Sequence, residues 1–234
     1  MGSEMCIRDS HKTSICVTKV QYGIYVIYKL PNAVELRQCD SESRWGTDMI
    51  KAVIFDMDGT LVDTERLGIK AWKAGAAELG LAIDEALIHQ FIGRTLPDVM
   101  DILDEHYGSH ETTEAIYRRH KEIRDEMVKT ELELKAGAAE CLDELLAAGY
   151  HVGLATSSRL VTAERNLKMV GLFGKFETVT CGEDVVHGKP DPEMYLLACE
   201  RAGFAPEECA VVEDSRNGCV SGITAGCHVF AVPD

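Results

Sequence analysis

Two aspartates stand two residues apart directly after a short apolar run. Asp56 and Asp58 follow residues 50–55, and Gly59 comes next. In an extended chain, residues two apart point to the same side, so both carboxylates would face one site. The glycine allows a sharp turn and a close approach of the backbone to a ligand. Taken alone, the pattern is equally typical of an acidic turn that merely ends a strand.

A second acidic pair, Glu213 and Asp214, follows the apolar residues 209–212. Four carboxylates at one edge of a sheet would repel one another strongly unless a cation joined them. Carboxylate oxygens suit Mg²⁺, which prefers one or two carboxylates together with waters and a substrate phosphate. The alternative, a solvated acidic turn, is weaker once two such turns share one edge. We therefore predict a Mg²⁺ site with the candidate ligands Asp56, Asp58, Glu213 and Asp214.

Three hydroxyl residues in a row form a candidate anion site. Thr156, Ser157 and Ser158 follow the apolar residues 151–155 and precede a predicted helix. Helix N-termini bind phosphate, so this segment could hold a phosphoryl group. Helix capping by Ser or Thr would explain one of the three without any ligand.

One lysine stands out by its position. Lys189 lies between Gly188 and Pro190, ahead of a helix predicted to start near Pro192. A lysine is usually a solvated charge. Beside several carboxylates and a phosphate, it would neutralise the charge that develops in a transition state.

These residues need a scaffold that brings them to one edge. Short apolar runs alternate with helical stretches, which predicts an α/β fold with a Rossmann-like, doubly wound parallel sheet. In such sheets, ligands bind at the carboxyl ends of the strands. The predicted strands are residues 50–55, 151–155, 176–180, 209–212 and 228–232.

One interval is too long for a single crossover. Between the first two predicted strands, the sequence is rich in helix formers and charged pairs, which predicts an inserted α-helical cap. We assign residues 64–134 to the cap, and 49–63 with 135–234 to the core. The predicted helices of this interval are residues 64–79, 84–91, 97–107, 111–129 and 138–148.

The first 48 residues differ from the rest. They carry as many basic as acidic side chains, so the formal net charge of -15 comes from the remainder. They lack sustained periodicity, and the segment SEMCIRDS resembles the translation of a sequencing adapter. We interpret residues 1–48 as a non-native or disordered extension.

Composition excludes several classes of protein. The acidic balance disfavours nucleic acid and anionic lipid as partners, and no apolar run approaches the roughly 18 to 20 residues of a membrane span. The nine cysteines include no Cys-x-x-Cys pair, which argues against a disulfide scaffold and favours a reducing cytoplasm. We expect a cytoplasmic monomer.

Four segments in order resemble the motifs of the haloacid dehalogenase superfamily. They are most similar to its β-phosphoglucomutase-like branch of phosphatases with a helical cap. The resemblance covers essentially all of residues 49–234, and four motifs in order at strand ends are far more specific than any one. The segments are DMDGTLVDTE from Asp56, LATS around Thr156, GKPDP around Lys189 and VVEDS around Asp214.

The resemblance implies a mechanism. Asp56 would be the nucleophile that forms an aspartyl-phosphate, and Asp58 the acid/base that protonates the leaving oxygen and then activates water. Mg²⁺ would be held by the Asp56 carboxylate, the Asp58 carbonyl oxygen and Asp214, with Glu213 as a direct or supporting ligand.

The phosphoryl group would be held by residues of the second and third motifs. Thr156, with Ser157 and Ser158, would hydrogen-bond it, and Lys189 would bridge it to Asp56. Positioning and electrostatics would supply most of the rate.

Departures from the family pattern bear on the substrate. Gly68 and Leu96 stand where the mutases carry a histidine and an arginine that hold the sugar phosphate, and Thr60 replaces their usual valine. Arg94 and Arg159 are candidates for contact with a second anionic group. We therefore expect a Mg²⁺-dependent phosphatase that hydrolyses a small phosphorylated metabolite, such as a sugar phosphate.

Two other functions stay open. A hexose-phosphate mutase of the same branch would retain the phosphate and need a bisphosphate primer. A receiver-like phospho-acceptor domain also places acids, a hydroxyl and a lysine at strand ends, but Asp58 and the helical insert argue against it. The family normally continues beyond Asp234 with a loop and a terminal helix, so we expect the C-terminus of the core to be truncated.

Overall fold

The computed structural model describes residues 50–91 and 96–232 in full, together with the backbone of residues 4–8, 14–18, 25–30 and 33–38. The chain divides into two compact units. One contains Met1–Leu61 and Leu134–Asp234, and the other contains Val62–Glu133.

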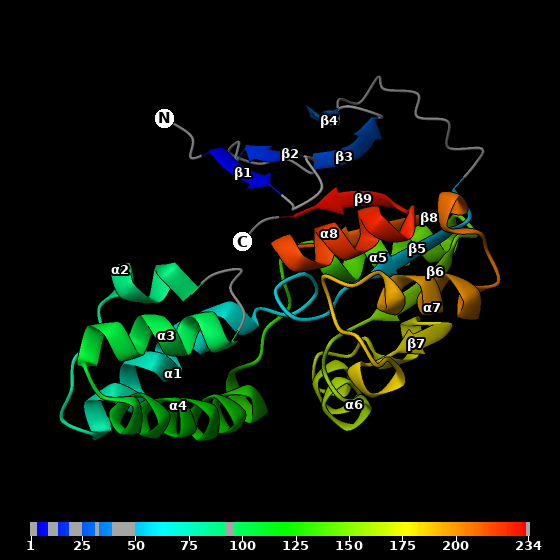
Figure 1. The fold of residues 1–234 in the computed structure, drawn as a ribbon. Coiled ribbons are helices and arrows are strands. Elements are labelled where there is room, and N and C mark those ends of the chain that lie inside the picture. The colour runs from blue at the N-terminus through cyan, green and yellow to red at the C-terminus, as the bar shows by residue number, and fades with distance from the viewer. Residues whose placement is uncertain are drawn as a thin grey trace. The chain divides into compact units, whose positions relative to one another are not determined.

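Five parallel strands form the centre of the first unit (Figure 1). Their order is β9-β8-β5-β6-β7, so the chain moves outward from β5 in one direction and then in the other. This reversal creates the switch point at which doubly wound sheets bind ligands. The predicted fold class is confirmed. The strands are β5 (Ala52–Phe55), β6 (His151–Ala155), β7 (Thr178–Thr180), β8 (Cys209–Glu213) and β9 (His228–Ala231).

Four α-helices and three short 3-10 helices connect these strands. The α-helices are α5 (Ala138–Ala147), α6 (Leu160–Met169), α7 (Glu193–Ala202) and α8 (Arg216–Ala225). The 3-10 helices are η2 (Phe173–Lys175), η3 (Gly182–Asp184) and η4 (Pro206–Glu208).

Helices α7 and α8 pack on one face of the sheet. Side chains that alternate along β5 and β8, such as Ile54 and Val211, join Tyr195 and Ile223 of the two helices in one buried cluster. Alternation along a strand places every second side chain on the same face. The sheet therefore fixes α7 and α8, and with them the loops that precede these helices.

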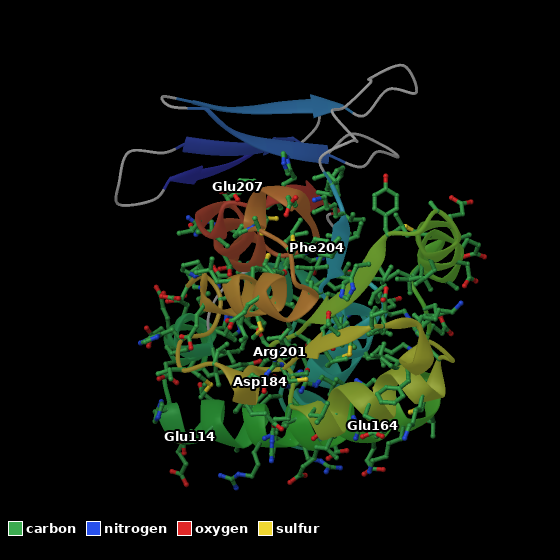
Figure 2. All side chains as sticks on the ribbon, turned by 90° about the vertical axis from the view of Figure 1, so that its right-hand side faces the viewer. Glu114, Glu164, Asp184, Arg201, Phe204 and Glu207 are labelled. Atoms are coloured by element: carbon green, nitrogen blue, oxygen red, sulfur yellow. The ribbon has the colours of Figure 1, made fainter. Side chains whose placement is uncertain are left out.

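An ion pair at the end of the 3-10 helix η3 adds a second attachment for α7. Arg201 Nη1 donates to Val179 O at 2.7 Å and to Asp184 Oδ2 at 2.8 Å, and Figure 2 labels Arg201 and Asp184. This arginine thus joins α7 to the middle of β7 and to η3.

The second unit consists of helices. They are α1 (Thr64–Glu78), α2 (Glu85–Ile88), the 3-10 helix η1 (His89–Phe91), α3 (Leu96–Tyr107) and α4 (His110–Glu131). Side-chain caps begin three of them, because Asp63, Asp84 and Ser109 each accept a bond from a backbone N–H three residues later. The predicted helix over residues 84–91 is divided into α2 and η1, a tightening that is common at helix ends.

Aromatic side chains form the core of the helical unit. Trp72 packs edge-on against Phe91, with ring centroids 5.2 Å apart, and stacks on His120 at 3.9 Å. Helices α1 and α4 approach closely at Gly75, where a Cβ atom would lie 2.9 Å from the His120 backbone nitrogen. Glycine is therefore needed where these two helices cross.

Four strands precede the first unit's parallel sheet. Strands β1 (Glu4–Arg8) and β2 (Ser14–Thr18) pair with each other, and β3 (Tyr25–Leu30) pairs with β4 (Ala33–Gln38). Strand β3 also runs antiparallel beside β9. Pairing alone does not decide whether the core needs this segment, so the interpretation of residues 1–48 as an extension stays a prediction.

Within the described part of the chain, no helix combines the length and apolar character needed to cross a membrane. The cysteines described there, at positions 141, 181, 199, 209, 219 and 227, are free thiols.

Candidate active site

The buried carboxylate of Asp56 lies at the centre of the candidate site. Its backbone nitrogen donates to Val212 O at 2.9 Å, which continues the pairing of β5 with β8 by one residue. Its side chain accepts a bond from Lys189 Nζ at 2.6 Å. The side chains of both residues are less than 10% exposed. The sheet therefore holds Asp56 in place from the backbone as well as from the side chain.

Lys189 bonds to the ends of three strands. Its ammonium donates to Asp56 Oδ1, to Ala155 O at 3.1 Å and to Glu213 Oε1 at 2.7 Å. An ammonium has three N–H donors, so all of them are used. Burial alone would lower the pKa of Lys189, but the two carboxylates outweigh that effect and raise the pKa above its ordinary value. Lys189 is therefore a fixed positive charge.

The loop that carries Lys189 is held on both sides. Asp191 N donates to Gly188 O at 3.0 Å, which closes the turn around the lysine. Ser221 of α8 donates its hydroxyl to Asp191 O at 2.6 Å. The loop is thus bound to the same helix that follows the second acidic pair.

Glu213 is the last residue of β8, and its carboxylate accepts four hydrogen bonds. Oε1 accepts from Lys189 and from the Tyr195 hydroxyl, the latter at 2.9 Å. Oε2 accepts from the backbone nitrogen and the hydroxyl of Ser215, at 3.0 and 2.9 Å. A carboxylate has about four lone-pair positions. Of the two roles predicted for Glu213, direct ligand or support, this geometry favours support.

The other members of the acidic cluster lie close by. One carboxylate oxygen each of Asp56, Glu213 and Asp214 lies within 4.8 Å of the others. Burial raises the pKa of the Asp56 carboxyl well above its ordinary value, Lys189 lowers it, and the acids Glu213 and Asp214 raise it further. These converging carboxylate oxygens form a donor set that fits a divalent cation.

Two glycines leave room for the carboxylates. Gly59 has φ +83°, and a Cβ there would lie 2.2 Å from Asp214 Oδ2. In α8, a Cβ on Gly218 would lie 1.7 Å from Glu213 Oε1. No side chain fits at either position. The Thr60 hydroxyl next to Gly59 donates to Asp214 Oδ1 at 3.1 Å, so this turn also orients the aspartate.

The half-buried carboxylate of Asp58 pairs with the hydroxyl segment. Ser158 donates its hydroxyl to Asp58 Oδ2 at 2.9 Å. Thr156 is fully buried, and its Oγ1 accepts from Ser158 N at 3.0 Å. Ser157 is exposed, and its carbonyl lies so near Gly182 that a Cβ there would be 2.3 Å away. The structure therefore brings the first and second motifs together through Ser158.

Of the two arginines predicted to bind substrate, the structure describes Arg159. Arg94 lies outside the described residues. Arg159 is the N-cap residue of α6, and its Nε lies 3.3 Å from Glu183 Oε2. Its side chain is 79% exposed, so an ion pair there contributes little to stability. A role of either arginine in substrate binding stays a prediction.

Sequence reasoning missed three residues that support the site. Tyr195 lies on the buried face of α7, Ser215 caps α8 and Gly218 lies inside α8. The serine directly after an acidic pair and before a helix carries a capping signal that could have been used. A buried tyrosine and a helical glycine give no comparable signal, because both are common in ordinary cores.

Comparison with known proteins gives a consistent result. Residues 53–232 match the family described as haloacid dehalogenase-like hydrolase. The chain is 35% identical over 182 residues to hexitol phosphatase A of Escherichia coli strain K12, covering 78% of this chain and 82% of that protein. It is 28% identical over 190 residues to β-phosphoglucomutase of Bacillus subtilis strain 168, covering 78% and 82%.

A solved structure agrees with these relatives. The crystal structure of a hydrolase of the same superfamily from Deinococcus radiodurans R1, with bound phosphate and sodium, matches with a TM-score of 0.65 and 29% identity. The match covers 77% of this chain and 80% of that one.

Proposed function

This chain belongs to the haloacid dehalogenase-like hydrolases, and from that premise we propose that it is a Mg²⁺-dependent phosphatase of small phosphorylated metabolites. The observation that carries the proposal is the position of Lys189. Its ammonium lies between Asp56 and Glu213, at 2.6 and 2.7 Å, in the same cluster as Asp214. A fixed cation beside a buried carboxylate suits attack on an anionic phosphate ester.

In the proposed first step, an oxygen of Asp56 attacks phosphorus while the bond from phosphorus to the ester oxygen breaks. Asp58 gives its proton to the departing oxygen, which leaves as an alcohol. The product on the protein is an aspartyl-phosphate. The bond between Ser158 and Asp58 supports this role, because it places the Asp58 carboxyl on the side of the hydroxyl segment.

In the second step, Asp58 takes a proton from a water molecule as that water attacks phosphorus. Inorganic phosphate leaves and Asp56 is regenerated as a carboxylate. Throughout, Lys189 neutralises charge next to Asp56, and Thr156 with Ser157 and Ser158 would bind the phosphoryl oxygens. Most of the rate would come from positioning and electrostatics, because the protein forms and breaks few bonds itself.

The residues proposed to hold Mg²⁺ are the carboxylates of Asp56 and Asp214 and the carbonyl oxygen of Asp58, with Glu213 as a support. When bound, the ion would polarise the phosphoryl group and reduce the repulsion between an anionic substrate and Asp56. The clustering of carboxylate oxygens within 4.8 Å supports this assignment.

The expected substrate is a phosphorylated sugar or polyol. The relative named hexitol phosphatase A supports that class. We propose that the helical unit acts as a cap that excludes water and selects the leaving group, as lids do in other enzymes. Free thiols in the described residues support a reducing, cytoplasmic location.

Mutase activity is the second candidate, because a β-phosphoglucomutase is among the relatives. Thr60, Gly68 and Leu96 depart from the residues that the mutases carry at these positions, which favours hydrolysis. Isomerisation of β-glucose 1-phosphate faster than its hydrolysis would reverse this order. A long-lived aspartyl-phosphate without turnover would instead support a receiver-like domain.

The proposal is tested by phosphate release from p-nitrophenyl phosphate, followed by a panel of sugar and hexitol phosphates, phosphoglycolate and nucleoside monophosphates. Asp56→Asn removes the nucleophile, so we expect release to fall by about 10³-fold or more. EDTA should abolish release and added Mg²⁺ should restore it. Asp143→Asn, a change at an exposed residue of α5, is the matched control. Full activity of Asp56→Asn would disprove the mechanism.

A further inference from the structure

Tyr195 is a fully buried side chain at the base of the candidate site. It lies in the first turn of α7, six residues after Lys189, and has no solvent exposure. Its ring contributes to the core, as a phenylalanine would. Its hydroxyl, however, points to Glu213 Oε1 at 2.9 Å. A buried hydroxyl needs a partner, and here the partner is a carboxylate that also bonds Lys189.

The contacts of Tyr195 with Lys189 are both direct and indirect. The Lys189 ammonium lies 4.8 Å from the centre of the Tyr195 ring, within the range of a cation–π contact. It also lies 2.7 Å from the Glu213 oxygen that accepts the tyrosine hydroxyl. The ring face of Tyr195 therefore contacts the Lys189 ammonium, and its hydroxyl donates to Glu213, the carboxylate that also bonds Lys189.

The hydroxyl is one of the groups that fix the orientation of Glu213. Ser215 holds Oε2 with two bonds, and Tyr195 holds Oε1 on the side away from Ser215. The carboxylate lies against the Gly218 backbone, in the space that a Cβ atom at Gly218 would occupy. With both oxygens held, Glu213 presents Oε1 to Lys189. Without the phenol, the Lys189 ammonium is the one side-chain donor to Oε1 that remains among the described residues.

We propose that Tyr195 is a positioning residue: its hydroxyl holds Glu213, which in turn places the Lys189 ammonium against Asp56. The inference rests on the proposed phosphatase function. It assigns Tyr195 no contact with the substrate. Small displacements of a positioned group can cost up to about 10²-fold in rate, so the loss of this hydroxyl should slow the chemical steps and leave substrate binding nearly unchanged.

The test is a double-mutant cycle with Tyr195→Phe and Glu213→Gln. In the otherwise native protein, Tyr195→Phe should lower kcat by about tenfold and change KM by less than about twofold. In the Glu213→Gln background, the same change should lower kcat by less than about twofold, because residues that act through one another give non-additive effects. If Tyr195 had a merely structural role, the fold-losses of kcat from the two substitutions would multiply in the double variant.

Folding is checked separately. Tyr195→Phe keeps the ring that fills the core, and thermal melts establish that kcat is measured on folded protein. Tyr107→Phe is the matched control, since Tyr107 also donates its hydroxyl to one acceptor, Ala82 O at 2.8 Å, in the helical unit. This control should keep its kcat.

The outcomes separate the two proposals. If the native protein is active and the Tyr195→Phe variant keeps the native kcat, the phosphatase proposal is unaffected and the inference about Tyr195 is wrong. An equal loss of kcat in both backgrounds also overturns it. A native protein that releases no phosphate from any compound of the panel disproves the phosphatase function, and this inference with it.

Discussion

Single glycines decide whether the acidic residues can take their positions. Gly218 lies inside α8, where glycine is an unfavourable residue for a helix. Its lack of a side chain leaves space for Glu213 Oε1, which a Cβ atom would approach to 1.7 Å. The cost of a glycine in this helix is therefore offset by the room it leaves for the carboxylate that holds Lys189.

Gly218→Ala should displace Glu213 and, with it, Lys189. We expect a loss of kcat of about 10²-fold and a fall in the free energy of unfolding of about 1–3 kcal/mol, as for other overpacked positions. Phosphate release and denaturant melts measure the two effects. Gly174→Ala, where a Cβ meets nothing within 4 Å, is the control. Native activity in Gly218→Ala would show that the carboxylate can move without consequence.

For single residues, the sequence alone was sufficient to place in the site those that directly follow strands. Asp56, Thr156 and Asp214 could be placed at one edge because the carboxyl ends of parallel strands meet there. Tyr195 could not be found in this way. Its helical spacing predicts only a core position, and its contact with Glu213 depends on how α7 packs against β8.

At the level of helices and strands, α1 and α4 enclose the polar side chain of His120 in an apolar core. The His120 ring stacks on Trp72, at an interplanar angle of 7°, and among the described residues neither of its ring nitrogens has a hydrogen-bond partner. Burial, together with the smaller effect of Arg124 on the same helix, lowers the pKa of His120 to about 3. The folded protein therefore holds this imidazole neutral.

Stability should fall as the solution becomes acidic. The unfolded chain protonates His120 near its ordinary pKa of about 6.5, whereas the folded protein does so only near 3. Between these values the unfolded state binds more protons, so the free energy of unfolding decreases by up to about 1.4 kcal/mol for each pH unit below 6.5. In urea melts, the free energy of unfolding of His120→Phe should depend less on pH than that of the native protein. His106→Phe, a change at an exposed histidine of the same unit, should not.

Helix and strand positions were largely predictable from sequence, whereas their ends were less so. The helices predicted over residues 97–107 and 111–129 correspond to α3 (Leu96–Tyr107) and α4 (His110–Glu131). The strand predicted over residues 176–180 is shorter, since pairing with β6 begins at Thr178. The strand predicted over 209–212 includes Glu213 as well. Periodicity reports which face is buried, but pairing with a neighbour decides where a strand ends.

For the whole molecule, the extension predicted at residues 1–48 lies ahead of the segment that matches a known family. The match to the hydrolase family begins at residue 53. The side chains of residues 1–49 lie outside the described part of the chain, so the interpretation of residues 1–48 as an extension stays a prediction. The expectation of a monomer stays a prediction.

A protein that begins at Met49 should fold and keep its activity. We expect its kcat within about twofold of the full chain's and its melting temperature within about 4–8 °C, the shift that about 1 kcal/mol produces in a small domain. Circular dichroism melts and phosphate release measure both. Aggregation or loss of activity of the shortened protein would show that β3 is needed beside β9.

Lys189 has a practical consequence for anyone who needs an inactive reference protein. Its ammonium joins the residue after β5, the last carbonyl of β6 and the last side chain of β8. It is thus a non-covalent cross-link of three neighbouring strands, and its removal would leave two buried carboxylates without their counter-charge. An inactive variant made at Lys189 would confuse loss of chemistry with loss of fold. Asp58, half-buried and bonded to Ser158, is the safer position for such a variant.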